Sequence, residues 1–213
     1  MPIPQIAKTV TVAGIPIDIA QGPIGICLSG GADSSLLLYI LMTHTDQPIH
    51  AFTCGAQKTL RATARVSQQV LHRCMELTGN INVTQHTWFV EKNNNRSALL
   101  AMPRQFMELQ WVNSVYLAET ANPQLEQVSQ FHDGALMHDI RDPLVQRQPW
   151  EPDGVYVPWT MVNKQGIASM YRELNLMQSL FPVTRSCNSK TCGYGHCGAC
   201  WFCSERQWGF GCL

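Results

Sequence analysis

The chain has 213 residues, of which 45% are hydrophobic and 14% charged, and its formal net charge at pH 7 is +0. Such a chain suits one α/β domain with a small appendage, and its neutrality argues against a nucleic-acid partner or an anionic membrane. The N-terminus has no basic region followed by an apolar core, and no run of about 18 apolar residues occurs. We therefore expect a cytoplasmic protein without a secretory signal or a membrane span.

The first elements in chain order are strands and helices in alternation. Polar and apolar residues alternate about Gly14 and predict a β-hairpin over 8–19, inside an N-terminal extension of residues 1–20. The main domain, 21–180, is predicted to begin with an apolar strand and an amphipathic helix. The elements expected up to residue 89 are strands at 24–28, 49–53 and 81–89, and helices from 35 to about 43 and from 59 to 78, with Gly79 ending the latter.

The second half continues this alternation. A polar loop at 91–97 is expected to lead into a long helix to about residue 120, with Pro103 in or before its first turn and with Met107, Trp111, Val115 and Ala118 on its inner stripe. The remaining expected elements are a strand at 127–131, an irregular loop at 132–153, a strand at 155–159 and a helix at 163–174 capped by Asn163. This order predicts an α/β, doubly wound, mostly parallel five-stranded sheet with ligands at the carboxyl ends of its strands.

A glycine-rich turn joins the first strand of this sheet to its helix. Residues 28–35 read Leu-Ser-Gly-Gly-Ala-Asp-Ser-Ser, and they resemble the pyrophosphate loop of the N-type ATP pyrophosphatases. Glycines let the backbone approach a phosphate, and N–H groups at a helix N-terminus face its oxygens. Asp33 would repel a bare phosphate, so we expect it to bind Mg²⁺ or to order the loop. The predicted ATP-binding residues are Leu28, Ser29, Gly30, Gly31, Asp33, Ser34 and Ser35. The alternative is a Ser/Gly turn that only caps the helix.

Cysteines crowd the C-terminal end. Of nine cysteines, six lie in the last 27 residues, at positions 187, 192, 197, 200, 203 and 212. Cys197, Cys200 and Cys203 form a C-x₂-C-x₂-C run, and Cys187 or Cys192 completes a set of four thiolates. Four thiolates are typical of structural zinc, here in a subdomain of residues 181–213. An iron–sulfur cluster and a redox dithiol are the alternatives.

The order of these motifs resembles the 7-cyano-7-deazaguanine synthase family, which forms a nitrile on the route to queuosine. The matching segments are Ser29–Ser34, Thr184–Cys187, Cys197–Cys203 with Arg206, Pro158 with Lys164, and, less closely, Pro103–Arg104. The resemblance implies an adenine nucleotide alpha hydrolase-like fold and zinc on Cys187, Cys197, Cys200 and Cys203. It also implies a ligase that uses ATP with Mg²⁺ and ammonia, in which Asp33, Lys164 and Arg104 are catalytic, and it leaves a homodimer open.

The implied reaction converts 7-carboxy-7-deazaguanine to 7-cyano-7-deazaguanine through an acyl adenylate and an amide. The substrate is expected between the loop after Phe131, the segment 159–164 and the zinc subdomain. Lys164 is expected to contact the phosphates or the acyl-adenylate oxygens, and its alternative is an exposed lysine at a helix start.

The chain departs from the family at 54–58 and 131–134, and Cys192 is an extra cysteine. Three alternatives follow from these departures and from the shared loop: an adenylating ligase that stops at the amide or uses another nucleophile, a tRNA-modifying ATP pyrophosphatase, and an inactive zinc-ribbon interaction module.

Overall fold

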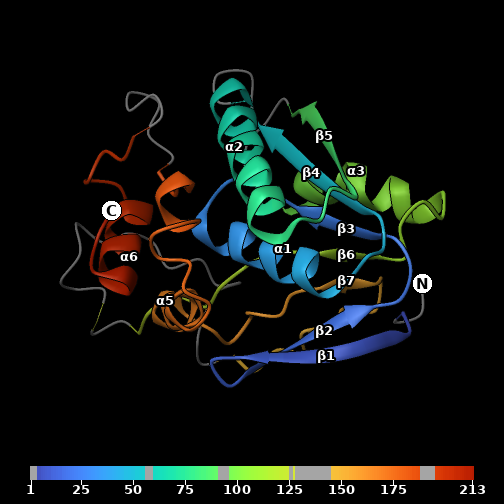
Figure 1. Ribbon diagram of the computed structural model, residues 1–213, viewed down its shortest axis with the longest axis horizontal. Coiled ribbons are helices and arrows are strands. Elements are labelled where there is room, and N and C mark those ends of the chain that lie inside the picture. The colour runs from blue at the N-terminus through green and yellow to red at the C-terminus, as the bar shows by residue number, and fades with distance from the viewer. Residues whose placement is uncertain (1–3, 56–59, 91–95, 125–126, 128–144, 188–194) are drawn as a thin grey trace.

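Five parallel strands form the main sheet of the protein. The computed structural model describes residues 4–55, 60–90, 96–124, 127, 145–187 and 195–213 (Figure 1). Within these residues the strands follow the order β5-β4-β3-β6-β7. Their bounds are β3 Ile24–Cys27, β4 Ile49–Gly55, β5 Val83–Phe89, β6 Ser114–Tyr116 and β7 Val155–Tyr156. The chain leaves β3 first towards β4 and β5 and later towards β6 and β7, so the predicted doubly wound α/β sheet is confirmed.

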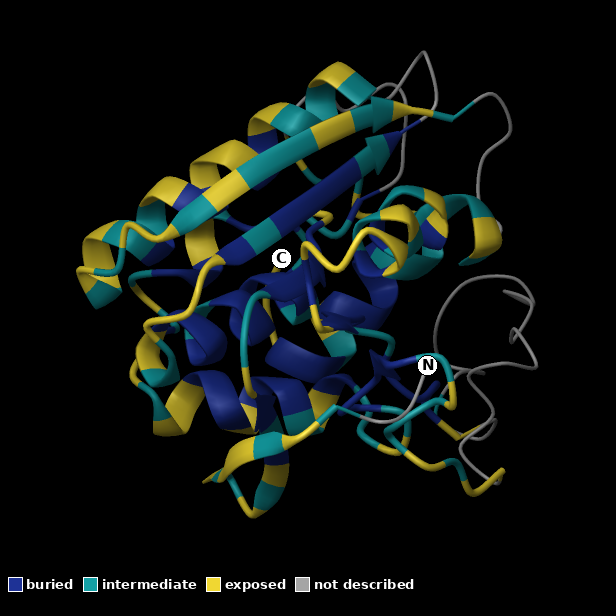
Figure 2. Cartoon of the chain, turned by 90° about the vertical axis from the view of Figure 1, so that its right-hand side faces the viewer, coloured by how far each residue is buried: buried dark blue, intermediate teal, exposed yellow. Residues whose placement is uncertain are grey.

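Helices cover both faces of this sheet. On one face, α1 (Ala32–His44), α2 (Leu60–Thr78) and α5 (Lys164–Glu173) pack over a large apolar core. On the other face, α3 (Arg96–Glu108) closes a smaller core that includes Leu100, Met107 and Val115. Figure 2 shows β4 mostly buried beside the edge strand β5, whose residues alternate between intermediate and exposed. No helix among the described residues has both the length and the apolar character needed to cross a membrane.

The N-terminal hairpin forms as predicted. Strands β1 (Ile6–Val12) and β2 (Ile15–Ala20) pair antiparallel, and the turn between them places Ala13 and Gly14 at φ 48° and 76°. Two positive φ values are what a two-residue hairpin turn requires. The hairpin is tied to the sheet because the Asp18 and Ala20 N–H groups donate to the hydroxyls of Tyr156 and Tyr116, at 2.8 and 2.9 Å.

Two helices and a short 3-10 turn complete the described C-terminal part. Asn163 caps α5 as predicted, because its Oδ1 accepts hydrogen bonds from the N–H groups of Gln165 and Gly166 at 3.0 and 3.2 Å. A 3-10 turn, η2 (Phe181–Val183), and the last helix, α6 (Trp201–Phe210), follow. In Figure 1, α5 and α6 lie side by side at the left, and these two helices pack against each other.

The predicted long helix to residue 120 is wrong. α3 ends at Glu108, and Ser114–Tyr116 forms the buried strand β6. A short apolar run fits a buried strand as well as a helix face, so periodicity did not separate the two. Trp111, expected on an inner stripe, is 55% exposed. Pro103 stands well inside the helix instead of in its first turn.

Other boundaries also differ from those predicted. β7 ends at Tyr156, two residues before Pro158, which has no N–H to donate to a ladder. The strand expected at 127–131 and the loop expected at 132–153 fall largely outside the described residues, and Gln127 itself has helical geometry.

Candidate functional site

The glycine-rich loop lies between the carboxyl end of β3 and the first turn of α1. Gly30 has a φ of +79°, and a Cβ there would lie 2.7 Å from Val66 Cγ1 and 3.0 Å from the Ser67 nitrogen. Only glycine therefore fits this position without moving α2. Gly31 is the N-cap residue of α1, and no side chain caps that end of the helix. The N–H groups of the first turn are thus left for an anion.

Serine hydroxyls hold the loop in shape. Ser29 Oγ lies 3.0 Å from Ser34 Oγ and accepts a hydrogen bond from the Gly31 N–H at 3.2 Å. Ser34 and Ser35 both donate to the Gly31 carbonyl, at 3.3 and 2.7 Å. These bonds stay within the predicted ATP-binding residues. They shape the loop, but no side chain caps the first turn of α1, so the turn does not act as the helix cap that the sequence left as an alternative.

Lys164 lies at this loop. It is the first residue of α5, and its Nζ forms an ion pair with Asp33 Oδ2 and lies 3.6 Å from Glu205 Oε2. Lys164 is buried, at 4% exposure, so the alternative of an exposed lysine is wrong. The structure thus brings together two of the three residues predicted to be catalytic. The other carboxylate oxygen, Asp33 Oδ1, is buried and accepts no hydrogen bond from the described residues, which suits a ligand of Mg²⁺.

Arg104, the third predicted catalytic residue, lies elsewhere. Its Nη2 and Nε contact Asp153 Oδ2 at 2.6 and 3.2 Å. Asp153 precedes β7, so the pair lies towards the amino ends of the parallel strands, opposite the edge that carries the loop. These contacts do not bring Arg104 together with Asp33 and Lys164.

A cavity of about 180 Å³ opens beside the loop, at the carboxyl ends of β3, β4 and β6. Its lining is mostly apolar, and it includes Ser29, Asp33 and Ser34 from the loop. Glu119 is its other carboxylate, held by an ion pair of 3.2 Å with Arg96, which also pairs with Glu151. The sequence analysis missed Glu119 because that residue was placed in a helix.

Two cysteines line the same cavity without being reactive. Cys27 is fully buried and Cys54 is half-buried, and burial raises the pKa of both thiols above their ordinary value. At neutral pH both are protonated, so neither is a nucleophile of the kind that needs a thiolate. Cys27 thus behaves as a small buried hydrophobe.

Four cysteines come together at the C-terminal end. The sulfur atoms of Cys187, Cys197, Cys200 and Cys203 all lie within 4.8 Å of one another. Cys197 and Cys203 are 3.8 Å apart, and Cys187 and Cys200 are 4.0 Å apart. Zinc–sulfur bonds of about 2.3 Å place tetrahedral ligand atoms about 3.8 Å apart, so this set fits zinc.

Backbone N–H groups beside Cys197 favour the thiolate form that binds a metal. N–H groups of Ala199 and Cys200 point at Cys197 Sγ and lower the pKa of its thiol to about 6. His196 is not part of the set, because its Nε2 accepts a hydrogen bond from the Ser186 N–H at 3.3 Å. Cys192 lies outside the described residues, so the choice of Cys187 rests on the four sulfur positions.

The segment that carries Cys187 touches the phosphate loop. The Arg185 N–H donates to the Gly30 carbonyl at 2.8 Å. Arg206, buried in α6, donates to Thr184 Oγ1 at 2.8 Å and stacks over the Phe181 ring at 3.8 Å. The segment Thr184–Cys187 and Arg206 thus form a structural link between the cysteine set and the loop.

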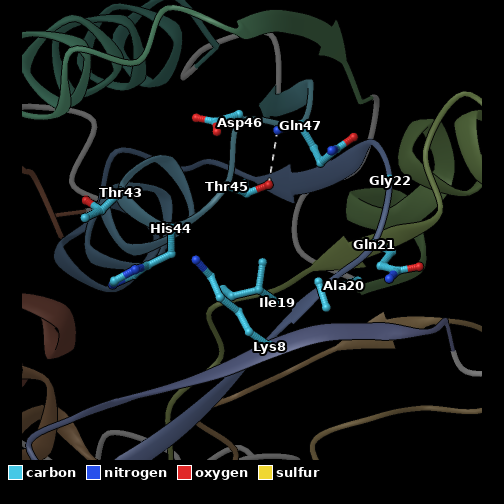
Figure 3. A pocket seen from close by; sticks show the side chains of 11 residues that line it. Lys8, Ile19, Ala20, Gln21, Gly22, Thr43, His44, Thr45, Asp46 and Gln47 are labelled. Carbon is cyan, nitrogen blue, oxygen red and sulfur yellow. Dashed lines mark hydrogen bonds between the residues drawn. The ribbon is translucent and has the colours of Figure 1, made fainter.

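A larger groove, of about 590 Å³, lies on another part of the molecule (Figure 3). The hairpin and the C-terminal end of α1 line it, and the Lys8 side chain extends towards His44. Burial and the Lys8 charge lower the pKa of His44. This groove contains no residue of the loop or of the cysteine set, and α1 points its negative end at it.

Known proteins resemble parts of this chain. The family model described as asparagine synthase matches residues 19–79, which carry the loop, α1, β4 and α2. No curated protein matches the chain by sequence. A solved structure of NH3-dependent NAD synthetase from Campylobacter jejuni, in complex with the nitrate ion, is similar at 17% identity, covering 76% of this chain and 67% of that one, with a TM-score of 0.42. The family match supports placing this chain in the N-type ATP pyrophosphatase superfamily, by the segment that carries the phosphate loop.

Proposed function

We propose that this protein is an ATP-dependent carbon–nitrogen ligase that converts 7-carboxy-7-deazaguanine and ammonia to 7-cyano-7-deazaguanine. One observation carries the proposal: the phosphate loop and a four-cysteine set are joined by the hydrogen bond from Arg185 to Gly30. The asparagine synthase match supports the ATP-cleaving half of the proposal. The motif resemblance described above supports the deazaguanine half.

In this reaction the substrate carboxylate attacks the α-phosphorus of ATP, and pyrophosphate leaves. Ammonia then adds to the acyl adenylate and AMP leaves, which gives the amide. The amide oxygen attacks a second ATP, again with loss of pyrophosphate. Loss of AMP and of the remaining amide protons then yields the nitrile.

The chain's own residues would serve the phosphates. The loop N–H groups and Ser29 and Ser34 would hold the β- and γ-phosphates, while Lys164 approaches the oxygens that gain charge as pyrophosphate leaves. Bound with ATP, Mg²⁺ would neutralise phosphate charge, and Asp33 is its proposed ligand. Zinc on the four cysteines would be structural, because four thiolates leave no open position.

The cavity of about 180 Å³ is the proposed place for the flat ring system of the substrate. Its lining includes no described residue of 159–164 or of 181–213, so this place differs from the one expected from the sequence. It is smaller than the pockets of roughly 300–1,000 Å³ that bury drug-sized ligands, so it suits one heterocycle and not a whole nucleotide. The Glu119 carboxylate, steadied by Arg96, is an acceptor for the paired N–H donors that a guanine-like edge presents. Trp159, the first residue of the segment 159–164 expected beside the substrate, is fully buried in the core.

Product mass tests the proposal. The protein is incubated with 7-carboxy-7-deazaguanine, ATP, Mg²⁺ and ammonium, and the product is weighed by mass spectrometry. The nitrile is the expected product. An amide alone would mean an adenylating ligase that lacks the dehydration step, which the altered segments at 54–58 and 131–134 would explain. Pyrophosphate release only with tRNA would favour the tRNA-modifying alternative, and no ATP cleavage at all would favour the interaction module.

A further inference from the structure

The buried neighbourhood of Lys164 contains a carboxylate that the reaction does not explain. Glu205 is fully buried in α6, two residues after Cys203, and its Oε2 lies 3.6 Å from Lys164 Nζ. Asp33 contacts the same ammonium from the other side. Burying a carboxylate costs free energy unless a cation compensates its charge. The position of Glu205 beside Lys164 therefore indicates that the two side chains act as a pair.

Helix α6 is built to bring this carboxylate close. A Cβ at Gly209 would lie 2.6 Å from Lys164 Cβ and 2.9 Å from the Lys164 carbonyl oxygen. Glycine therefore lets α6 pack directly on the first turn of α5. Tyr171 fixes α5 in turn, because its hydroxyl donates to the Ala32 carbonyl at 2.8 Å. The Lys164 backbone thus has little freedom, and the direction of its side chain depends on its two carboxylate partners.

These partners differ in their relation to ATP. Asp33 belongs to the phosphate loop, and its Oδ1 is the proposed ligand of Mg²⁺, so with the nucleotide bound its charge would be shared between the metal and Lys164. Glu205 belongs to the cysteine-bearing segment and not to the loop. It can hold the ammonium while Asp33 is engaged.

We propose that Glu205 is a positioning residue that keeps Lys164 directed at the phosphates of ATP when Asp33 is engaged by Mg²⁺. The helix that bears two of the four cysteines, Cys200 as its cap and Cys203 in its first turn, thereby forms part of the ATP site. This inference rests on the ATP site of the proposed function and not on the deazaguanine substrate.

The test is a double-mutant cycle of Glu205→Gln and Lys164→Met, read by the equilibrium binding of ATP with Mg²⁺. Glutamine keeps the shape of the side chain and removes its charge. Glu205→Gln is expected to weaken ATP binding by about tenfold. In the Lys164→Met background the same change should have no further effect, because Glu205 acts through Lys164. Additive losses, or unchanged binding by Glu205→Gln, would overturn the proposal.

Controls separate positioning from folding. Zinc content by elemental analysis and the midpoint of thermal unfolding are measured for every variant, and Glu173→Gln, at the far end of α5, is the matched control that should bind ATP normally. If Glu205→Gln alone is unstable, the double variant restores the charge balance of the pair and is compared with Lys164→Met. Since the readout is ATP binding without an acyl substrate, a wrong substrate would leave this result intact.

Discussion

At the scale of single residues, the proposed reaction depends on one buried lysine. Lys164 pairs with Asp33 and lies near Glu205, and all three side chains are largely shielded from water. Charges held in such surroundings interact more strongly than exposed pairs, whose net contribution is small. A lysine kept there beside a phosphate loop is placed for an anion.

Replacing this lysine should slow the reaction. We expect Lys164→Met to lower turnover at saturating ATP by more than about tenfold, or about 1.4 kcal/mol of barrier, because the charge that meets the phosphate oxygens is lost. Steady-state release of pyrophosphate measures the effect. Lys8→Met, an exchange of the same kind on the exposed hairpin, should leave turnover within about twofold. Equal turnover in both variants would remove Lys164 from the ATP site.

How far the sequence predicts these residues depends on whether a motif carries them. The loop and the cysteines are recognisable from spacing, because phosphate cradles and zinc sites need fixed intervals along the chain. Glu205 and Glu119 carry no such signal, since their roles come from packing between distant segments. Arg104 shows the converse: a partial motif match put it at the site, while its contacts lie with Asp153.

At the scale of elements, the turn after β3 matters more than the helix that follows it. Gly30 adopts a left-handed φ against the backbone of α2, whereas Gly14 adopts a similar φ in an open hairpin turn with no neighbour within 4 Å. Position 30 therefore requires glycine for two reasons, the positive φ and the lack of space for a Cβ. At position 14 only the first reason applies.

This contrast gives a matched pair of variants. Gly14→Ala should cost only the conformational strain of about 1–2 kcal/mol and keep ATP cleavage. Gly30→Ala adds a clash with Val66 and Ser67, so it should cost a further 1–3 kcal/mol, roughly, and abolish ATP cleavage. Chemical denaturation and pyrophosphate release measure the two effects. Similar losses of stability and activity in both variants would contradict the geometry of the loop.

The strands β4 and β5 carry a histidine pair with a pH dependence. His50 Nδ1 lies 2.9 Å from His86 Nε2, burial lowers the pKa of both, and the His50 charge lowers that of His86 further. The unfolded chain then binds more protons than the folded one below about pH 6.5, so this part of the stability is present above that pH and lost as the pH falls through it.

When the pH is lowered from 7.5 to 5.5, the midpoint of thermal unfolding should fall by less in His86→Gln than in the unaltered protein. Removing one histidine removes both its own lowered pKa and the repulsion it exerts on the other. Scanning calorimetry at the two pH values measures the difference. An identical fall in both proteins would mean that the pair does not contribute.

Also at the scale of elements, length decided which predictions held. The long amphipathic helix α2 and the hairpin about Gly14 have strong periods and clear turn chemistry, and both are present. β6 is only three residues long, Ser114–Tyr116, and three residues are too few to show a period. Its identity as a strand depends on pairing with β3, which no local pattern reports.

At the scale of the whole molecule, the C-terminal segment also holds the proposed ATP site in place. Arg185 bonds to Gly30, and α6 packs on the start of α5 beside Lys164. Order in this segment would depend on metal, because in small metal sites binding energy is folding energy. Loss of the metal would then loosen the phosphate loop.

Three cysteine variants test this dependence. Cys200→Ser should lose the one zinc expected per chain and with it most ATP binding. Cys212→Ser should keep both, because Cys212 is exposed and is not among the four clustered sulfur atoms. Elemental analysis and ATP titration give the two readouts, and Cys192→Ser should also keep the metal. Iron with sulfide in place of zinc, or full zinc in Cys200→Ser, would contradict the assignment.

The most direct measurement identifies which bond of ATP is broken. The protein is incubated with ATP, Mg²⁺, ammonium and 7-carboxy-7-deazaguanine, and the phosphorus products are followed by ³¹P NMR. A phosphate loop that cradles the β- and γ-phosphates while the α-phosphate is attacked predicts AMP and pyrophosphate in equal amounts, formed only when the acyl substrate is present. ADP with inorganic phosphate, or ATP left intact, would contradict it.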